Sequence, residues 1–224
     1  MENPVAVVGG AGRVGRLVVA GLLEQGERVR VVSRRARGAG AAESFRADIR
    51  DRASLAAPLA GCSAVVISVE PGTADSGPNS PEATMYQGVR NVLDAATADG
   101  GKPHIVLVSQ IYVTRKGHPI NAQGRMLDWR LAGEDAIRAS GLPYTVVRPS
   151  WLTDGRRGGA VRLEQGDLGD GQISRQDVAD ACVQALYSPS ALAVTFEMYN
   201  APGTARTGWD ELFQGLAPDL STAR

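Results

Sequence analysis

The stretch Val5-Ala-Val-Val-Gly9-Gly10-Ala11-Gly12-Arg13-Val14-Gly15 decides the fold of this chain. Its four apolar residues predict a buried strand, and an apolar helix over 13–25 and a second strand over 28–33 follow. Glycine permits a tight turn, bare backbone for a diphosphate to approach, and close packing of the helix on its strand. The segment therefore predicts a dinucleotide site, with the diphosphate at the start of the helix. Three glycines recur at every third residue: Gly9, Gly12 and Gly15.

The end of the second strand indicates which dinucleotide is bound. NAD sites of this kind carry Asp or Glu about 20 residues after the glycines, where the carboxylate holds the ribose 2′-hydroxyl. This chain has Ser33, Arg34 and Arg35 there. A guanidinium offers a planar pair of donors to a phosphate, and Arg13 in the turn is placed to reach the same group. We therefore expect NADP(H); the alternative is that Arg34, Arg35 and Arg37 form a solvated basic loop.

Length and composition predict one domain over 1–224, with a core of six or seven strands. The 24 basic and 24 acidic residues balance, so the chain offers no net charge to nucleic acid or to an anionic membrane. The longest apolar runs have the length of strands, and no leader peptide is evident. We expect a cytoplasmic protein whose partner is a small-molecule substrate. The oligomeric state, monomer or dimer, stays open.

Cysteine and histidine are too few and too scattered for a metal site. Cys62 and Cys182 lie in apolar surroundings without C-x-x-C spacing, which indicates packing residues. His104 and His118 are the two histidines, and no cluster of carboxylates replaces them. We expect no metal.

Strand and helix patterns alternate along most of the chain, which predicts a Rossmann-like α/β fold. The sheet is expected to be doubly wound and parallel, with a small C-terminal substrate-binding portion. Asp51 is placed to cap a helix, and the pattern loosens in the glycine-rich stretch 154–171. Loops over 70–81, 110–122 and 150–173 are expected to line the substrate pocket. The expected strands are 4–9, 28–33, 43–47, 63–68, 104–109, 144–148 and 194–199, and the expected helices are 13–25, 52–60, 82–99, 122–140, 175–187 and 207–215.

Four further segments resemble a known family, the atypical short-chain dehydrogenase/reductases of the NAD(P)H-binding, NmrA-like type. They are Ala47-Asp48-Ile49-Arg50-Asp51, Val108-Ser109, the run from Gly133 to Pro149, and Ile173-Ser-Arg-Gln-Asp177-Val-Ala-Asp180. The resemblance implies that Asp48 contacts adenine. Beyond the N-terminal unit, the residues expected at the cofactor are Asp48, Ile49, Ser68, Val69, Ser109, Arg130 and Pro149.

The chain departs from this family's pattern at the catalytic pair. Standard members use Tyr-x-x-x-Lys on a helix, where the phenol donates a proton and the lysine lowers its pKa. In the family register this chain has Met126 at the tyrosine position and Arg130 at the lysine position. Methionine donates no proton, and we expect Met126 at the substrate. Arg130 is expected to hold ribose or polarise an oxygen; a solvated helix arginine is the alternative.

A second Tyr-x-x-x-Lys, Tyr112 to Lys116, is not expected to act as a pair. Its residues favour extended backbone, and the spacing works only on a helix. Tyr112 by itself stays a catalytic candidate, because it follows the carboxyl end of the strand at 104–109. Ser109 is a second candidate, for hydrogen bonding to a substrate carbonyl, although its hydroxyl also suits a loop cap. His118, a residue type that titrates near neutral pH, is the third.

Two side chains near these strand ends are expected at the substrate. Gln110 follows Ser109, and Trp151 follows the segment Arg148-Pro149-Ser150, so its ring is placed to stack on a flat molecule. Packing in the core is the alternative for Trp151 and for Trp129. The function expected is NADPH-dependent reduction of a small planar carbonyl, quinone or enone. The alternatives are a flavin or biliverdin-type reductase and a non-catalytic protein that senses NADP(H).

Overall fold

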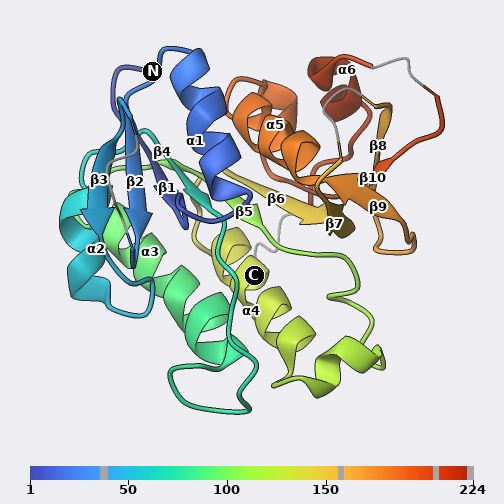
Figure 1. The fold of residues 1–224 in the computed structure, drawn as a ribbon, viewed down its shortest axis with the longest axis horizontal. Coiled ribbons are helices and arrows are strands. Elements are labelled where there is room, and N and C mark those ends of the chain that lie inside the picture. Colours follow the sequence, from blue (N-terminus) through green and yellow to red (C-terminus); the bar gives the residue numbers. More distant parts are fainter. Residues whose placement is uncertain (36–39, 156–158, 204–206, 221–224) are drawn as a thin grey trace.

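A sheet of eight strands forms the centre of the part that the computed structural model describes, which is residues 1–35, 40–155, 159–203 and 207–220 (Figure 1). The strand order is β3-β2-β1-β4-β5-β6-β10-β8, and each neighbouring pair is parallel except β10 with β8. The chain runs outward from β1 to β3, returns, and continues on the other side from β4. This order confirms the predicted Rossmann-like fold. The strands are β1 Val5–Val8, β2 Val29–Ser33, β3 Glu43–Arg46, β4 Ala64–Ile67, β5 His104–Val108, β6 Tyr144–Pro149, β8 Val161–Glu164 and β10 Val194–Asn200.

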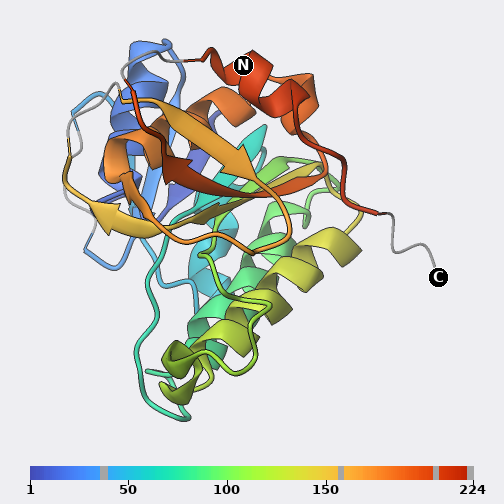
Figure 2. The same ribbon diagram turned by 90° about the vertical axis from the view of Figure 1, so that its right-hand side faces the viewer.

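Helices cover both faces of this sheet (Figure 2). On one face lie α1 Gly15–Glu24, α5 Arg175–Ala185 and α6 Trp209–Gln214. On the other lie α2 Arg52–Leu59, α3 Gly88–Ala96 and α4 Met126–Ala139. Three short helical segments connect them: η1 Glu82–Gln87, which is π-helical, and the 3₁₀ turns η2 Pro119–Ala122 and η3 Pro189–Ala191.

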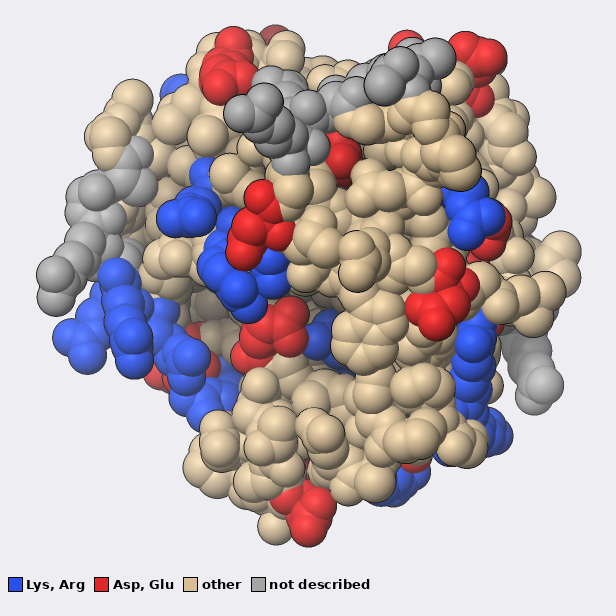
Figure 3. Space-filling model, turned by 45° about the vertical axis from the view of Figure 1, so that its right-hand side comes forward, with Lys and Arg blue, Asp and Glu red and all other residues tan. Residues whose placement is uncertain are grey.

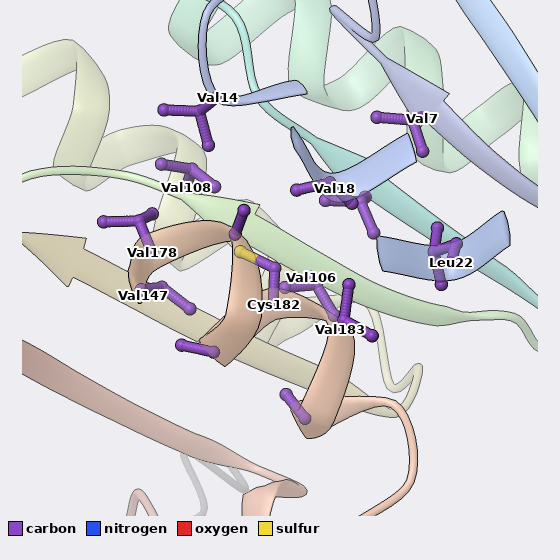
Figure 4. Close-up of a cluster of buried hydrophobic side chains, with 14 of the residues drawn as sticks. Val7, Val14, Val18, Leu22, Val106, Val108, Val147, Val178, Cys182 and Val183 are labelled. Carbon is purple, nitrogen blue, oxygen red and sulfur yellow. The ribbon is translucent and has the colours of Figure 1, made fainter. Parts of the chain in front are cut away.

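The core consists of two apolar layers, because each central strand buries side chains on both faces. Val5 and Val7 of β1 belong to one layer, and Ala6 and Val8 to the other. Figure 4 shows the first layer, where α1 and α5 place apolar side chains over the strands. The side chains labelled there are Val7, Val14, Val18, Leu22, Val106, Val108, Val147, Val178, Cys182 and Val183.

The largest departure from the prediction lies in the glycine-rich stretch and its flanks. We expected no strand there, but β8 joins the sheet beside β10, and β7 Trp151–Thr153 pairs with β9 Gln172–Ser174. The central sheet therefore has eight strands in the described chain, and the prediction of six or seven strands was wrong. These strands have three or four residues each, too few to show an alternating pattern, and their partners are distant in sequence.

Four of the expected helices begin differently, and one of them, expected over 207–215, begins at Trp209. The helix expected over 13–25 begins at Gly15, after the glycine turn. The one expected over 82–99 opens with the π-helical segment η1, and the one expected over 122–140 begins at Met126, after η2. Helix termini are the boundaries that sequence patterns place least well.

Partly buried His104 makes folding stability depend on pH. Burial lowers the pKa of its ring from 6.5 to about 4, and its Nε2 lies 2.9 Å from Thr145 Oγ1. Between these pH values the unfolded chain binds a proton that the folded protein excludes, so stability falls as the pH is lowered. We expect this group to cost about 2 kcal/mol between pH 7 and 4.5. Urea unfolding at both pH values tests it: His104→Gln should lose less stability than the wild type, and equal losses contradict the assignment.

Candidate dinucleotide site

The glycine turn after β1 has a shape that side chains would block. Gly9 has φ +87°, and a Cβ there would lie 2.0 Å from the carbonyl oxygen of Ser68. A Cβ on Gly15 would lie 2.2 Å from the carbonyl oxygen of Gly9. The first turn of α1 therefore packs directly on the chain that leaves β1, and the helix begins without a side-chain cap.

A cleft of about 510 Å³ opens beside this turn, and we call it the N-terminal cleft. It lies at the carboxyl ends of β1, β2 and β4, where ligands bind in open parallel sheets. Figure 3 shows a hollow in the surface with basic side chains along its rim and acidic ones among them. The lining includes Gly9, Gly12, Arg13, Val14, Ser33, Arg34, Arg35, Asp48, Ile49, Arg50, Ser68, Val69, Glu70, Gly72, Thr84, Leu152 and Arg175.

Polar groups at the end of β2 fit the ribose and phosphate of a nucleotide. Arg13, Arg34 and Arg35 are exposed at the cleft. The hydroxyl oxygen of Ser33 is buried and has no hydrogen-bond partner in the described residues. A buried hydroxyl without a partner is costly, so this one suits a ligand oxygen. Arg37 lies outside the described residues.

Asp48 also lines the cleft, but its carboxylate already has a partner. Arg50 donates to it from Nε at 2.9 Å and from the backbone N–H at 3.0 Å. These hydrogen bonds, chiefly those of the side chain, hold the pKa of Asp48 below its ordinary value. A contact of Asp48 with adenine, which stays a prediction, would have to share or displace Arg50.

A second cavity of about 270 Å³ adjoins the first, and we call it the β5–β6 cavity. Glu70, Leu152 and Arg175 line both, so the two spaces meet there. The cavity lies at the carboxyl ends of β5 and β6, beside α4. Its other lining residues are Ser109, Gln110, Ile111, Tyr112, Ile120, Arg130, Pro149, Ser150 and Trp151.

Two ion pairs lie at or beside the junction of the cavities. Nη2 of Arg130 is 2.8 Å from Glu70 Oε2, and Nη1 of Arg175 is 2.7 Å from Asp154 Oδ1. Each pairs a buried guanidinium with an acid that is more than three quarters exposed, since Glu70 is 78% and Asp154 77% exposed. The cationic partner is thus the one that the fold holds in place.

Tyr112 forms a wall of the β5–β6 cavity. Its φ is +74°, its backbone N–H donates to Asp167 Oδ1 at 2.6 Å, and its hydroxyl donates to Asp170. The ring is stacked on His118 at 4.3 Å and lies 4.5 Å from the guanidinium of Arg115. Burial and the hydrogen bond to Asp170 raise the pKa of Tyr112, which weakens it as an acid. Residues 111–114 form turns, so Tyr112 and Lys116 do not share a helix face.

The structure brings most of the predicted site residues to these two cavities. Every expected cofactor residue lines one of them except Gly15, which is buried under the turn. Among the other candidates, Ser109, Gln110, Tyr112, Arg130 and Trp151 line the β5–β6 cavity. Met126 and His118 line neither: Met126 is buried at the start of α4, and His118 packs on Tyr112. The roles of all these residues stay predictions.

Sequence reasoning gave no individual role to the lining residues Arg50, Glu70, Ser150 and Arg175, although Glu70 and Ser150 lie in loops expected to line the substrate pocket. Arg50 and Arg175 lie inside segments that carried the family resemblance, and their charge was the available signal. Ser150 directly follows β6, so the rule that ligands bind at carboxyl ends of strands was able to find it. Glu70 carried no sequence signal other than its position in the loop 70–81.

The described residues contain neither a metal-binding cluster nor a helix that could span a membrane. Nowhere in them do three or more His, Cys, Asp or Glu side chains gather in a way that would hold a metal ion. Among their helices, none combines the length and the apolar character needed to cross a membrane.

This fold and these cavities define a Rossmann-fold protein with a candidate dinucleotide cleft. The chain belongs to the family described as NAD(P)H-binding, whose sequence profile matches residues 9–189. The family resemblance read from the four segments is thereby confirmed. The family is one of proteins that bind NAD(P)H.

Three curated relatives show the range of this family. An uncharacterized chloroplastic protein of Arabidopsis thaliana is 33% identical over 93% of this chain and 74% of its own length. Sanguinarine reductase of Eschscholzia californica is 34% identical over 59% of this chain and 52% of its own. The (4-alkanoyl-5-oxo-2,5-dihydrofuran-3-yl)methyl phosphate reductase of Streptomyces griseus is 31% identical over 81% of this chain and 62% of its own. The chain thus spans only part of each relative.

Solved structures share the fold at low sequence identity. A putative NAD-dependent epimerase/dehydratase from Bacillus halodurans has a TM-score of 0.80 at 23% identity, covering 95% of this chain and 99% of that one. A short-chain dehydrogenase/reductase from Veillonella parvula, solved in complex with NADP, has a TM-score of 0.71 at 16% identity, covering 91% and 97%. These likenesses support the fold.

Replacing Gly15 by alanine tests the close packing of α1 on the turn. The new Cβ would lie 2.2 Å from the Gly9 carbonyl oxygen, so the helix must shift away from the turn. We expect a loss of about 1–3 kcal/mol in unfolding free energy, as for other overpacked sites, together with weakened dinucleotide binding. Gly208→Ala is the matched control, because a Cβ there meets nothing within 4 Å. Equal stability and binding in both variants would refute this packing.

Proposed function

We propose that this protein is an NADPH-dependent reductase of a small, planar carbonyl, quinone or enone compound. The observation that carries the proposal is the junction of the two cavities, where a basic nucleotide cleft meets a smaller space lined by buried polar groups. Relatives named as reductases support the reaction class. We place the protein in the cytoplasm, although several plant relatives are named chloroplastic.

Preference for NADPH over NADH is proposed from the end of β2. The position that would hold a carboxylate for NAD carries Ser33, followed by two arginines at the rim of the cleft. Arg34 and Arg35 would bind the 2′-phosphate, with Arg13 facing them from the turn. Bound NADPH supplies the hydride. The chain orients the reactants and keeps water from them.

The β5–β6 cavity is the proposed substrate pocket. Its volume of about 270 Å³ suits a small molecule, and Trp151, 52% exposed, offers an aromatic face at its wall. Tyr112 lines this cavity, but its hydroxyl already donates a hydrogen bond to Asp170. Among the described side chains that line the cavity, none therefore has an acidic proton free for the product. We infer that the proton on the product oxygen comes from solvent.

Consumption of NADPH against a panel of acceptors tests the proposed function. The panel holds quinones, aromatic ketones, enones, free flavins and a linear tetrapyrrole, each with NADH as the control cofactor. We expect oxidation of NADPH with a quinone or enone and much slower oxidation of NADH. Turnover with flavin or tetrapyrrole alone would support the flavin or biliverdin type. Binding of both redox forms without turnover would support the sensing protein.

A further inference from the structure

We propose that Ser150 joins Ser109 and Arg130 in a site for a substrate oxyanion, and that this site selects conjugated acceptors over simple ketones. The proposal rests on the proposed function and assigns the part of the cavity that holds the reacting oxygen. It gives a role to Ser150, which no sequence motif marked.

The three groups share one cavity and lack partners. Ser109 Oγ, Ser150 Oγ and Arg130 Nε are each buried without a hydrogen-bond partner in the residues described, and each residue is 4% exposed. They come from three elements, since Ser109 follows β5, Ser150 follows β6 and Arg130 lies on α4. Leaving a buried polar group unpaired is unfavourable, so three in one cavity indicate a site built for a polar ligand atom.

The ligand atom must be an acceptor and is favoured as an anion. A guanidinium only donates and keeps its charge, and both serines also donate. Glu70 binds Arg130 through Nη2, which fixes the guanidinium and leaves Nε with no partner in the cavity. Because Glu70 is 78% exposed, water weakens its attraction for the guanidinium, which can therefore share its charge with an anion in the cavity.

The site stabilises the negative charge on the product oxygen by hydrogen bonds and leaves its protonation to water. Hydride transfer to the β-carbon of an enone would form a C–H bond and shift the π electrons to give an enolate oxygen. Hydride transfer to one oxygen of a quinone would form an O–H bond and leave a phenolate at the other oxygen, and in both cases NADPH would be oxidised to NADP⁺. The three donors would hold this oxyanion until water supplies the proton. A phenolate or enolate is stable for that time, whereas the alkoxide from a saturated ketone is far more basic. Quinones and enones should therefore be reduced and simple ketones should not.

Two variants with matched controls test the oxyanion site in turnover. With the best quinone or enone, Arg130→Met should lower kcat about 10²-fold and Ser150→Ala about tenfold, with the KM for NADPH little changed. Arg130→Met should fold, because its partner Glu70 is already solvated. The controls are Arg52→Met and Ser140→Ala, since Arg52 is exposed on α2 and Ser140 bonds the end of its own helix. Unchanged kcat in both test variants would overturn the proposal.

A binding experiment decides the proposal even without turnover. A nitrophenol is added to the NADP⁺-loaded protein and to the free protein, and its absorbance separates phenol from phenolate. The wild type should bind the phenolate and lower the apparent pKa of the ligand, and Arg130→Met and Ser150→Ala should reduce both effects. Binding as neutral phenol, no binding, or equal binding to all variants would overturn the oxyanion site. Failure of the acceptor panel with this phenolate binding intact would instead count against the proposed reductase.

Discussion

Replacing Arg34 and Arg35 together by alanine should weaken NADPH binding by about 2–6 kcal/mol and leave NADH binding nearly unchanged, at about 1–3 kcal/mol for each charge-assisted contact. Both side chains are exposed at the rim of the N-terminal cleft, beside the buried hydroxyl of Ser33. Only NADPH carries the 2′-phosphate that they are placed to bind. Titration of both cofactors into wild type and variant measures the difference.

The matched control for this variant is Arg16→Ala. Arg16 is exposed in the first turn of α1, close to the glycine turn, but it does not line the cleft. Its loss removes one positive charge from the same region and should change neither affinity by more than a few tenths of a kcal/mol. Equal weakening of NADPH and NADH by the double variant, or equal effects of the control, would refute a 2′-phosphate site at this strand end.

The second large effect is expected from Arg148→Met. Arg148 donates to fully buried Glu134 on α4, from Nη2 at 2.6 Å, and to Glu197 on β10, from Nη1 at 2.9 Å. Its removal leaves two buried carboxylates without this cationic partner, so we expect a loss of about 3–5 kcal/mol in unfolding free energy. Arg138 also binds Glu134, at 2.8 Å, which favours the lower end of that range. Urea unfolding near neutral pH measures the loss.

Arg162→Met provides the comparison for that loss. Arg162 pairs with Glu164 at the surface, where the side chains are 45% and 36% exposed, and such pairs contribute about 0–1 kcal/mol. The network around Arg148 joins α4 to β6 and β10 and thereby fixes the helix that carries Arg130. If both variants lose the same small amount, the buried network does not hold this helix.

The N-terminal half of the fold follows from local patterns in the sequence. The apolar runs of β1 and β4 and the glycines around Gly15 act over a few residues, so period and turn chemistry suffice to predict them. The strands β7, β8 and β9 depend on partners far along the chain. Leu163, for example, pairs with Met198, and the sequence within four residues of Leu163 does not predict that pairing.

The site was predictable where function depends on a contiguous stretch. Most of the turn after β1 and the run Ser33 to Arg35 line one cleft, as expected from their positions after β1 and β2. Ser150 and Glu70 line the same cavity as Arg130 only because the strand order brings β4, β5 and β6 side by side. The sequence pattern also did not predict that Asp48 pairs with Arg50, because this side-chain pairing depends on local backbone geometry.

The most direct test of the account is a crystal structure of the protein with NADP⁺. We expect the diphosphate to lie over the turn formed by residues 9–15 and the 2′-phosphate to accept hydrogen bonds from Arg34 or Arg35. The nicotinamide ring should point toward the junction with the β5–β6 cavity. An empty cleft at saturating NADP⁺, or a 2′-phosphate directed into solvent away from both arginines, would contradict the account.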